Sequence, residues 1–263
     1  MFTFSSDPTT LEVLTAVPVP DTAHWVSQAR HSRWRPIQHG ALAQALLDEA
    51  EALGLCVERH SWQLSGSGST ELFGALDFLP TPSLGLPEGI GFSVGVRHSN
   101  AGRYALTLIT GGRVEVCANG LFVGEQVLCR RHTEELELRA TVRRGLVDAL
   151  GQSGAVRHWV TRLKGVGVRG HQADRVMMEA ARQGVLPWSA MQHVDRAWRQ
   201  PPHAAFRPRT AWSLYNAFTE VARGRRPAGQ LTALRGLRSL FAEQGLDGVL
   251  GRRRGSARRG VHE

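Results

Sequence analysis

Residues 95–122, GVRHSNAGRYALTLITGGRVEVCANGLF, contain the pattern that decides the fold. Hydrophobic residues alternate with small or polar ones in FSVGVRH (residues 92–98), YALTLIT (residues 104–110) and RVEVCA (residues 113–118). A period of two is typical of strands with one buried face, because successive side chains point to opposite sides of a sheet. The pattern predicts three consecutive half-buried strands.

The segments that join these strands are short and rich in turn-forming residues. SNAG (residues 99–102) and TGGR (residues 110–113) each fit a tight hairpin, the second through its two glycines. Asn119 and Gly120 form a third turn signal, because both residues tolerate positive φ. We therefore predict an antiparallel β-meander in which the chain turns back again after Gly120.

An alternative interpretation of this corner is a reactive or metal-binding site. Cys117, Cys129 and His132 lie close together in the sequence, but a closed zinc site needs a fourth ligand and their spacing matches no familiar zinc module. No general base for Cys117 can be recognised. We therefore expect Asn119 to serve the turn, and we expect no catalytic residue, no metal and no cofactor. Free cysteines are most often buried, and we expect this of Cys56, Cys117 and Cys129, as reduced thiols.

Helical periodicity surrounds the predicted sheet. PIQHGALAQALLDEAEALG (residues 36–54) predicts a helix, and CVERHSWQL (residues 56–64) with ELFGALDFL (residues 71–79) predicts a hairpin. Thr133 is predicted to cap a long helix that continues through LRATVRRGLVDAL. Five further helices are predicted in AVRHWVTRL, HQADRVMMEAARQG, SAMQHVDRAW, RTAWSLYNAFTEVARG and QLTALRGLRSLFAEQG.

The predicted fold class is α+β: a helix, an antiparallel β-meander sheet, then a mainly helical C-terminal half. We place an extended N-terminal arm at residues 1–33 and the α+β sheet domain at residues 34–153. A helical region packed on the sheet follows at residues 154–247. Residues 248–263, GVLGRRRGSARRGVHE, are predicted to be a disordered basic tail.

The charge of the chain favours a nucleic-acid partner. The 263 residues include 32 basic and 23 acidic ones, for a net charge of +9, and Lys164 is the only lysine. Arginine makes bidentate contacts with phosphate and stacks on bases. Codon usage in a GC-rich genome explains the preference for arginine equally well. No apolar run is long enough to span a bilayer and the start shows no signal-peptide pattern, so we expect a cytoplasmic protein without a membrane partner.

Four arginines are candidates for phosphate contacts. The predicted strands place Arg97 and Arg113 on the less apolar face of the meander, among small residues. Arg130 and Arg131 form a basic pair before the first long helix of the C-terminal half. A sheet face of this composition can hold a single nucleic-acid strand, and it is equally compatible with a solvated face or a platform for helices.

The segment TAWSLYNAFTE (residues 210–220) offers a different kind of contact. On a helix, Trp212 and Asn216 share one face, with Tyr215 beside them, and this mixed aromatic and amide stripe can stack and hydrogen-bond a base. More often such a stripe docks a helix on a sheet, with the amide bound to neighbouring backbone. We favour docking and keep Trp212, Tyr215 and Asn216 as candidate nucleic-acid contacts.

These segments together resemble a family catalogued as domain of unknown function 932, found in proteins of phages and plasmids. The matching pieces are residues 95–122, RRHT (residues 130–133) and TAWSLYNAFTE, and the resemblance extends from about Trp34 to Phe241. The family commonly has an acidic residue between the cysteine and the asparagine of the first motif, where this chain has Ala118. The resemblance implies a mobile genetic element and no established activity. The order of elements is also similar to the core of single-strand annealing proteins of recombination, a likeness of topology that does not fix function.

We therefore expect a non-catalytic protein that binds nucleic acid, with single-stranded DNA favoured, in recombination or replication of a phage or plasmid. The first alternative is a protein-interaction module, such as an inhibitor of a host defence system. The second is an enzyme or metal protein that uses Cys117, Asn119 and His132. Whether the chain forms a homo-oligomer is left open.

Overall fold

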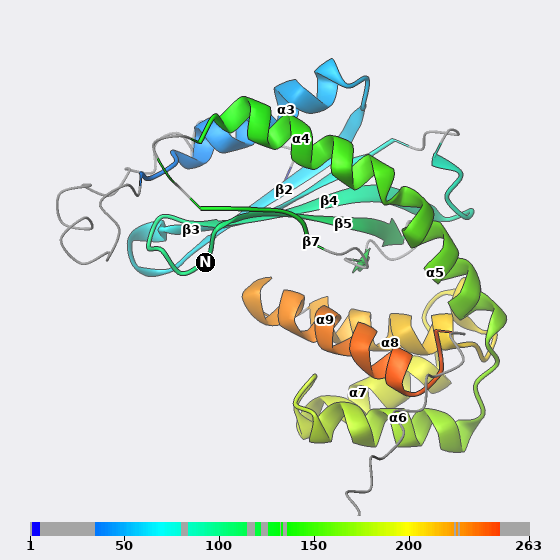
Figure 1. Cartoon of the computed structure of the whole chain (residues 1–263). Coiled ribbons are helices and arrows are strands. Elements are labelled where there is room, and N and C mark those ends of the chain that lie inside the picture. The colour runs from blue at the N-terminus through cyan, green and yellow to red at the C-terminus, as the bar shows by residue number, and fades with distance from the viewer. Residues whose placement is uncertain are drawn as a thin grey trace, which may run out of the picture.

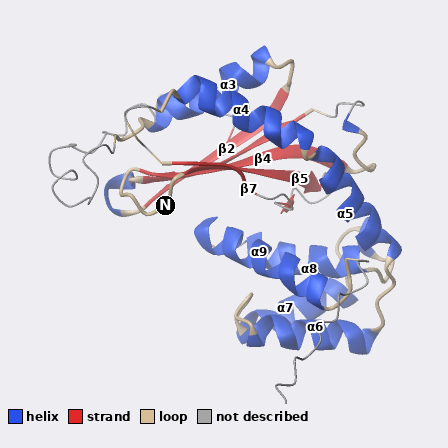
Figure 2. Cartoon of the chain, in the orientation of Figure 1, coloured by secondary structure: helices blue, strands red, loops and turns tan. Residues whose placement is uncertain are grey.

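The computed structural model describes residues 2–5, 35–79, 84–114, 119–121, 126–131, 133, 136–223, 225 and 227–247. A twisted antiparallel sheet lies between two groups of helices (Figure 1). Helices α3 (His39–Ala52) and α4 (Leu138–Gly151) cover one face, and the C-terminal helices lie on the opposite side (Figures 1 and 2). The chain is therefore an α+β protein with a mainly helical C-terminal half, as its sequence predicts.

In the described ranges the sheet contains seven strands in the order β1-β2-β3-β4-β5-β6, with β7 paired to β5 beside β6. All the pairings are antiparallel. The strands are β1 (Phe2–Ser5), β2 (Val57–Ser65), β3 (Glu71–Phe78), β4 (Ile90–Ser99), β5 (Leu106–Val114), β6 (Asn119–Leu121) and β7 (Gln126–Arg130). A short 3-10 turn, η1 (Ser67–Ser69), joins β2 to β3. Within the predicted N-terminal arm, β1 adds a strand to the outer edge of β2.

The predicted turn at TGGR is wrong, because Gly111 and Gly112 lie inside the continuous strand β5. Gly112 pairs with Phe92 of β4. A Cβ atom on Gly112 would lie 3.2 Å from the backbone oxygen of Gly91 and 3.6 Å from Val156. The glycine therefore permits a close approach between neighbouring segments and does not provide positive φ.

The predicted turn at Asn119 and Gly120 is also wrong. Both residues lie in β6, where Asn119 pairs with Val114 and Gly120 pairs with Arg113. The reversal from β5 to β6 is therefore complete before Asn119. The segment that contains Cys117 lies outside the described residues.

The apolar face of the sheet is covered by α3 (His39–Ala52) and α4 (Leu138–Gly151). The core between them includes Leu42 and Leu46 of α3 and Val142 and Leu146 of α4, all fully buried. At Gly145, α4 approaches the sheet so closely that a Cβ atom would lie 2.4 Å from Cδ1 of Leu108. The alternating apolar residues of the strands therefore serve to hold these two helices.

Helix α4 begins at Leu138, and Glu137 is its N-cap. The prediction that Thr133 caps this helix is wrong. The backbone N–H of Leu136 donates to the carbonyl of Thr133 at 3.0 Å, so Thr133 opens a turn that precedes the helix.

The remaining helices form a second core. They are α5 (Ser153–Gly165), α6 (Gly170–Arg182), α7 (Trp188–Arg199), α8 (Ala211–Arg223) and α9 (Pro227–Glu243), with the 3-10 turn η3 (Ala204–Phe206) before α8. Every residue from Ala211 to Thr219 is buried, so α8 is the central helix of this group. Ile90 and Val114 at the end of the sheet join the same core. No helix among the described residues is long and apolar enough to cross a membrane.

Residues 97–100, which belong to the segment 95–122, link the sheet to the start of α3. The side-chain oxygen of Asn100 accepts from the backbone N–H of Ile37, and its amide nitrogen donates to the carbonyl of Ile37, both at 2.9 Å. Next to it, Nδ1 of His39 lies 2.9 Å from Nε2 of His98, and both rings are buried. Nε2 of His39 donates to the carbonyl of Ser69. These contacts give His98 and Asn100 structural roles.

Candidate functional site

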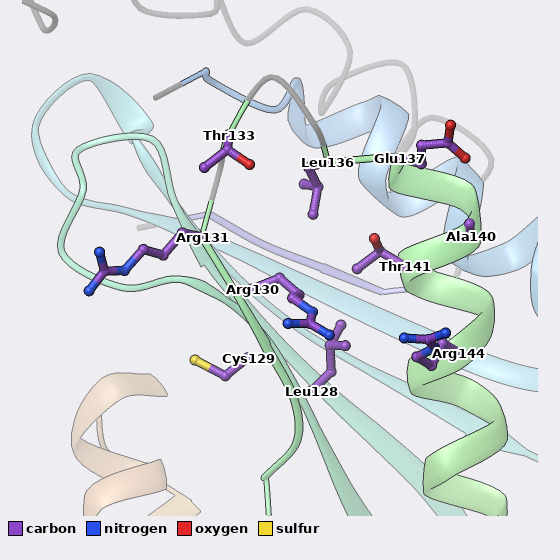
Figure 3. Close-up of a pocket in the computed structure, with 10 residues that line it drawn as sticks. All are labelled: Leu128, Cys129, Arg130, Arg131, Thr133, Leu136, Glu137, Ala140, Thr141 and Arg144. Atoms are coloured by element: carbon purple, nitrogen blue, oxygen red, sulfur yellow. The ribbon is translucent and has the colours of Figure 1, made fainter. Parts of the chain in front are cut away.

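A pocket of about 570 Å³ lies between β7 and the first turns of α4 (Figure 3). We call it the β7–α4 pocket. Its floor is apolar and its rim carries arginines and threonines. It is lined by Leu128, Cys129, Arg130, Arg131, Thr133, Leu136, Glu137, Ala140, Thr141 and Arg144.

The alternation of β7 distributes the arginines around its edge. Arg130 pairs with Leu106, whose side chain lies in the core under α4, so Arg130 points to the α4 side of the sheet. Cys129 pairs with Thr107 and points to the opposite side, and Arg131 also points away from α4 (Figure 3). The guanidinium groups of Arg130 and Arg144 both reach into the space between β7 and α4 (Figure 3).

The arginines of this pocket differ from their neighbours in having no acidic partner among the described residues. On the same helix, Arg139 contacts Asp48 and Glu49 of α3 at 3.1 and 3.0 Å, and Arg143 contacts Glu49 at 3.2 Å. Arg144 faces away from α3 and forms no ion pair with a described residue. The same holds for Arg130 and Arg131, and all three side chains are exposed.

This arrangement suits an anion with an apolar part. The arginines offer planar forks of donors that fit phosphate oxygens, and the hydroxyl of Thr141 lies on the same side as Arg130 and Arg144 (Figure 3). Leu128 and Leu136 provide apolar surface. Among the described residues, Glu137 is the one carboxylate that lines the pocket, against three arginines.

Arg113 is not available for phosphate. Its side chain is 15% exposed and contacts Glu58 at 3.2 Å and Asp77 at 3.5 Å. Asp77 also accepts hydrogen bonds from Arg59 and, at 2.5 Å, from the hydroxyl of Ser93. The predicted role of Arg113 is wrong, because acidic residues of β2 and β3 neutralise its charge.

Arg97 lies in a different setting on the same face of the sheet. Its guanidinium lies over the ring of Tyr104, 5.3 Å from the ring centroid. Nε is buried without a hydrogen-bond partner. Within the described part of the chain, the side chain makes neither a hydrogen bond nor an ion pair. Burial lowers the pKa of Arg97, and the positive charge of Arg235 on α9 lowers that pKa further.

Trp212, Tyr215 and Asn216 are buried in the helical core, so the proposed contacts of these three residues with a base are wrong. They are 4%, 0% and 1% exposed. The ring of Tyr215 packs edge-on against Trp159 and Phe241. The amide nitrogen of Asn216 donates to the carbonyl of Trp212 at 2.9 Å. The aromatic and amide stripe therefore packs α8 among its neighbours, and burial raises the pKa of Tyr215.

The expectation of buried cysteines is wrong for Cys56 and Cys129, which are free and exposed. Cys129 belongs to the β7–α4 pocket. In the ranges that the structure describes, no group of three or more His, Cys, Asp or Glu side chains is arranged to hold a metal ion. Cys117 and His132 lie outside those ranges.

Three residues of this region were missing from the sequence-based candidates: Arg144, Tyr104 and Arg235. Arg144 follows Arg143 in the sequence, and the two arginines differ only in the face of α4 on which they lie. Arg143 lies on the face that contacts Glu49 of α3, and Arg144 does not. The spacing of Arg139 and Arg143 (i, i+4) is a usable signal, because it assigns both to one face and Arg144 to another.

The fold and the pocket define an α+β protein with an arginine-lined groove at the edge of its sheet. The chain belongs to the family described as Domain of unknown function (DUF932), whose model matches residues 94–254. The match contains the β7–α4 pocket and the helical core, and it begins within β4, so α3 and strands β1 to β3 precede it. No curated protein and no solved structure matches the chain significantly.

Proposed function

We propose that this protein is a non-catalytic nucleic-acid-binding protein that holds single-stranded DNA in the β7–α4 pocket. We further propose that it acts in the cytoplasm, in recombination or replication of a phage or plasmid. Phosphate contacts provide most of the affinity of proteins for nucleic acids, and arginine is well suited to them.

The observation that carries the proposal is the contrast between Arg143 and Arg144. Arg143 is engaged by a carboxylate of α3, whereas Arg144 shares an open pocket with Arg130 and with no ion-pair partner among the described residues. Arg130 and Arg144 direct two positive charges into the same space without a carboxylate partner among the described residues, and this arrangement favours a bound anion. A phosphate group supplies that anion.

The test compares Arg130→Ala/Arg144→Ala with the unaltered protein in fluorescence anisotropy titrations of a labelled single strand over a series of salt concentrations. Each phosphate contact to a single strand contributes about 0.7 to the slope of log K against log salt. Loss of two contacts should reduce the magnitude of the slope by about 1.4. An unchanged slope and affinity in the double variant would refute the proposal that the β7–α4 pocket binds the strand.

Arg143→Ala is the matched control for Arg144→Ala. Each removes one positive charge from the same helix, so general effects of net charge are equal. Only Arg144→Ala removes a group that faces the pocket. We expect Arg144→Ala to weaken binding more than Arg143→Ala does, and circular dichroism checks that both variants keep their helices.

A protein-interaction module is the second candidate, because two large hydrophobic side chains of the helical half face solvent. Met178 of α6 is 44% exposed and Trp188 of α7 is 54% exposed. Deleting residues 251–263, which contain five arginines, separates the two functions. A DNA-binding protein should lose salt-sensitive affinity for the strand, whereas an interaction module should keep its affinity for its protein partner.

A further inference from the structure

The opposite face of the sheet contains a second group of unpaired cations. Arg97 of β4 and Arg235 of α9 belong to elements far apart in the sequence, yet the charge of Arg235 acts on Arg97. Neither side chain forms an ion pair within the described residues. Tyr104 lies beside Arg97 and packs edge-on against Phe73, at 5.7 Å between centroids.

In the absence of a ligand, the environment of Arg97 destabilises the folded protein. The side chain of Arg97 is half-buried, and its Nε–H donor is buried without an acceptor among the described residues. Burying a charged donor without an acceptor destabilises a folded protein, and a second cation nearby adds repulsion. A bound phosphate removes both penalties, since it accepts hydrogen bonds and carries negative charge.

The register of the sheet connects this group to the β7–α4 pocket. Arg97 pairs with Thr107, and Thr107 pairs with Cys129, so all three side chains point to the same face. Two strand spacings, about 10 Å, separate Arg97 from Cys129. Among the described strands, β7 pairs with β5 only. At the other edge of β7, Arg130 points to one face of the sheet and Arg131 points to the opposite face (Figure 3).

We propose that Arg97 and Tyr104 form a second phosphate site, to which the charge of Arg235 contributes, and that one DNA strand reaches it from the β7–α4 pocket by crossing the edge of β7 that faces away from β5. This inference rests on the proposed function and adds the path of the strand. Arg144 and Arg130 hold phosphates on the α4 side, Arg131 holds the strand at the edge, and Arg97 with Arg235 holds it on the opposite face.

The path selects single strands over duplexes. Consecutive residues of β7 direct their cations to opposite faces of one sheet edge, so the ligand must bend around a single strand of the sheet. Duplex DNA has a persistence length of about 50 nm and resists such a bend. A single strand follows a charged groove and changes direction within a few nucleotides.

The first test uses Arg97→Met and Arg235→Ala, with Arg175→Ala as the control. Arg175 is an exposed arginine of α6 without an ion pair among the described residues, so its loss changes net charge equally. With an oligonucleotide of about 15 nucleotides, we expect Arg97→Met and Arg235→Ala each to lower affinity about tenfold, the loss of one charge-assisted phosphate contact. Arg175→Ala should bind like the unaltered protein.

The second test measures how fast a thiol reagent labels each cysteine, with and without the oligonucleotide, by peptide mass mapping. Cys129 lies on the proposed path and is exposed, whereas Cys56 is exposed before β2 and serves as internal control. Labelling of Cys129 should slow several-fold in the complex, and labelling of Cys56 should not change.

The outcomes separate this inference from the proposed function. Loss of binding in Arg130→Ala/Arg144→Ala, with unchanged binding in Arg97→Met and Arg235→Ala, overturns the second site alone. Unchanged labelling of Cys129 in the complex overturns the path. Absence of any binding by the unaltered protein overturns both proposals. Arg97→Met should keep or raise the free energy of unfolding, so a folding defect does not explain its weaker binding.

Discussion

Gly145 provides a quantitative test of how α4 is seated on the sheet. A Cβ atom at this position would lie 2.4 Å from Cδ1 of Leu108 and 3.3 Å from Cδ2 of Leu128. Leu108 is fully buried in the core beneath α3 and α4, so its side chain has no open space into which it can turn. We predict that Gly145→Ala lowers the free energy of unfolding.

Two effects of opposite sign determine the magnitude. Alanine is favoured over glycine inside a helix by about 0.8–1.0 kcal/mol. Carbon atoms attract each other best at about 3.5–4.0 Å, so the new methyl group overlaps Leu108 by more than about 1 Å. Overpacking a core by one carbon costs about 1–3 kcal/mol, and this overlap falls at the upper end. The net loss should be about 2 kcal/mol.

Urea denaturation followed by circular dichroism measures the change. Gly151→Ala is the control, because a Cβ at this position of the same helix meets nothing within 4 Å. Its free energy of unfolding should stay the same or rise. If Gly145→Ala also proves as stable as the unaltered protein or more stable, α4 does not lie against β5 as described.

Three further predictions concern buried polar groups. Burial lowers the pKa of His39 below 6.5, so the unfolded chain binds more protons than the native state in acid. The free energy of unfolding should therefore fall as the pH drops through about 6.5, and His39→Gln, which cannot ionise, should weaken this dependence in denaturation curves at each pH. Asn100→Ala leaves the N–H and carbonyl of Ile37 without partners and should cost about 2–4 kcal/mol; a loss under about 1 kcal/mol would contradict the bridge. Tyr215→Phe removes a buried hydroxyl without a hydrogen-bond partner among the described residues, so thermal unfolding should show equal or greater stability, and a clear loss would reveal a partner.

The fold class was predictable from the sequence because its main signals are local. Alternation in FSVGVRH and in YALTLIT identifies the side chains that face α3 and α4, such as Val94 and Leu108. The prediction that these strands are half-buried is wrong, because nearly every residue of β4 and β5 is buried, on both faces of the sheet. The continuation of β5 through Gly111 and Gly112 was not predictable, because a pair of glycines is compatible with either a turn or a close approach between strands. Gly112 lies opposite Phe92 and under Val156, and neither neighbour can be identified from the local sequence.

The candidate site was predictable only in part, because the availability of an arginine depends on distant residues. Arg113 is neutralised by Glu58 and Asp77, which lie 55 and 36 residues earlier in the chain. Arg97 belongs to the same face and has no such partner among the described residues. The stripe of Trp212, Tyr215 and Asn216 has the composition of a base-binding surface, but α8 is buried on all sides over residues 211–219, as is usual for the central helix of a bundle.

The most direct test of the central claim is the affinity of the unaltered protein for a fluorescent single-stranded oligonucleotide across a salt series. The account predicts binding at low salt and a linear fall of log K with log salt, with a slope of about −0.7 for each phosphate held. Four occupied phosphate sites, at Arg130, Arg131, Arg144 and Arg97, give a slope near −3 (about 4 × 0.7). Absence of binding at low salt, or an affinity that does not change with salt, would contradict the account.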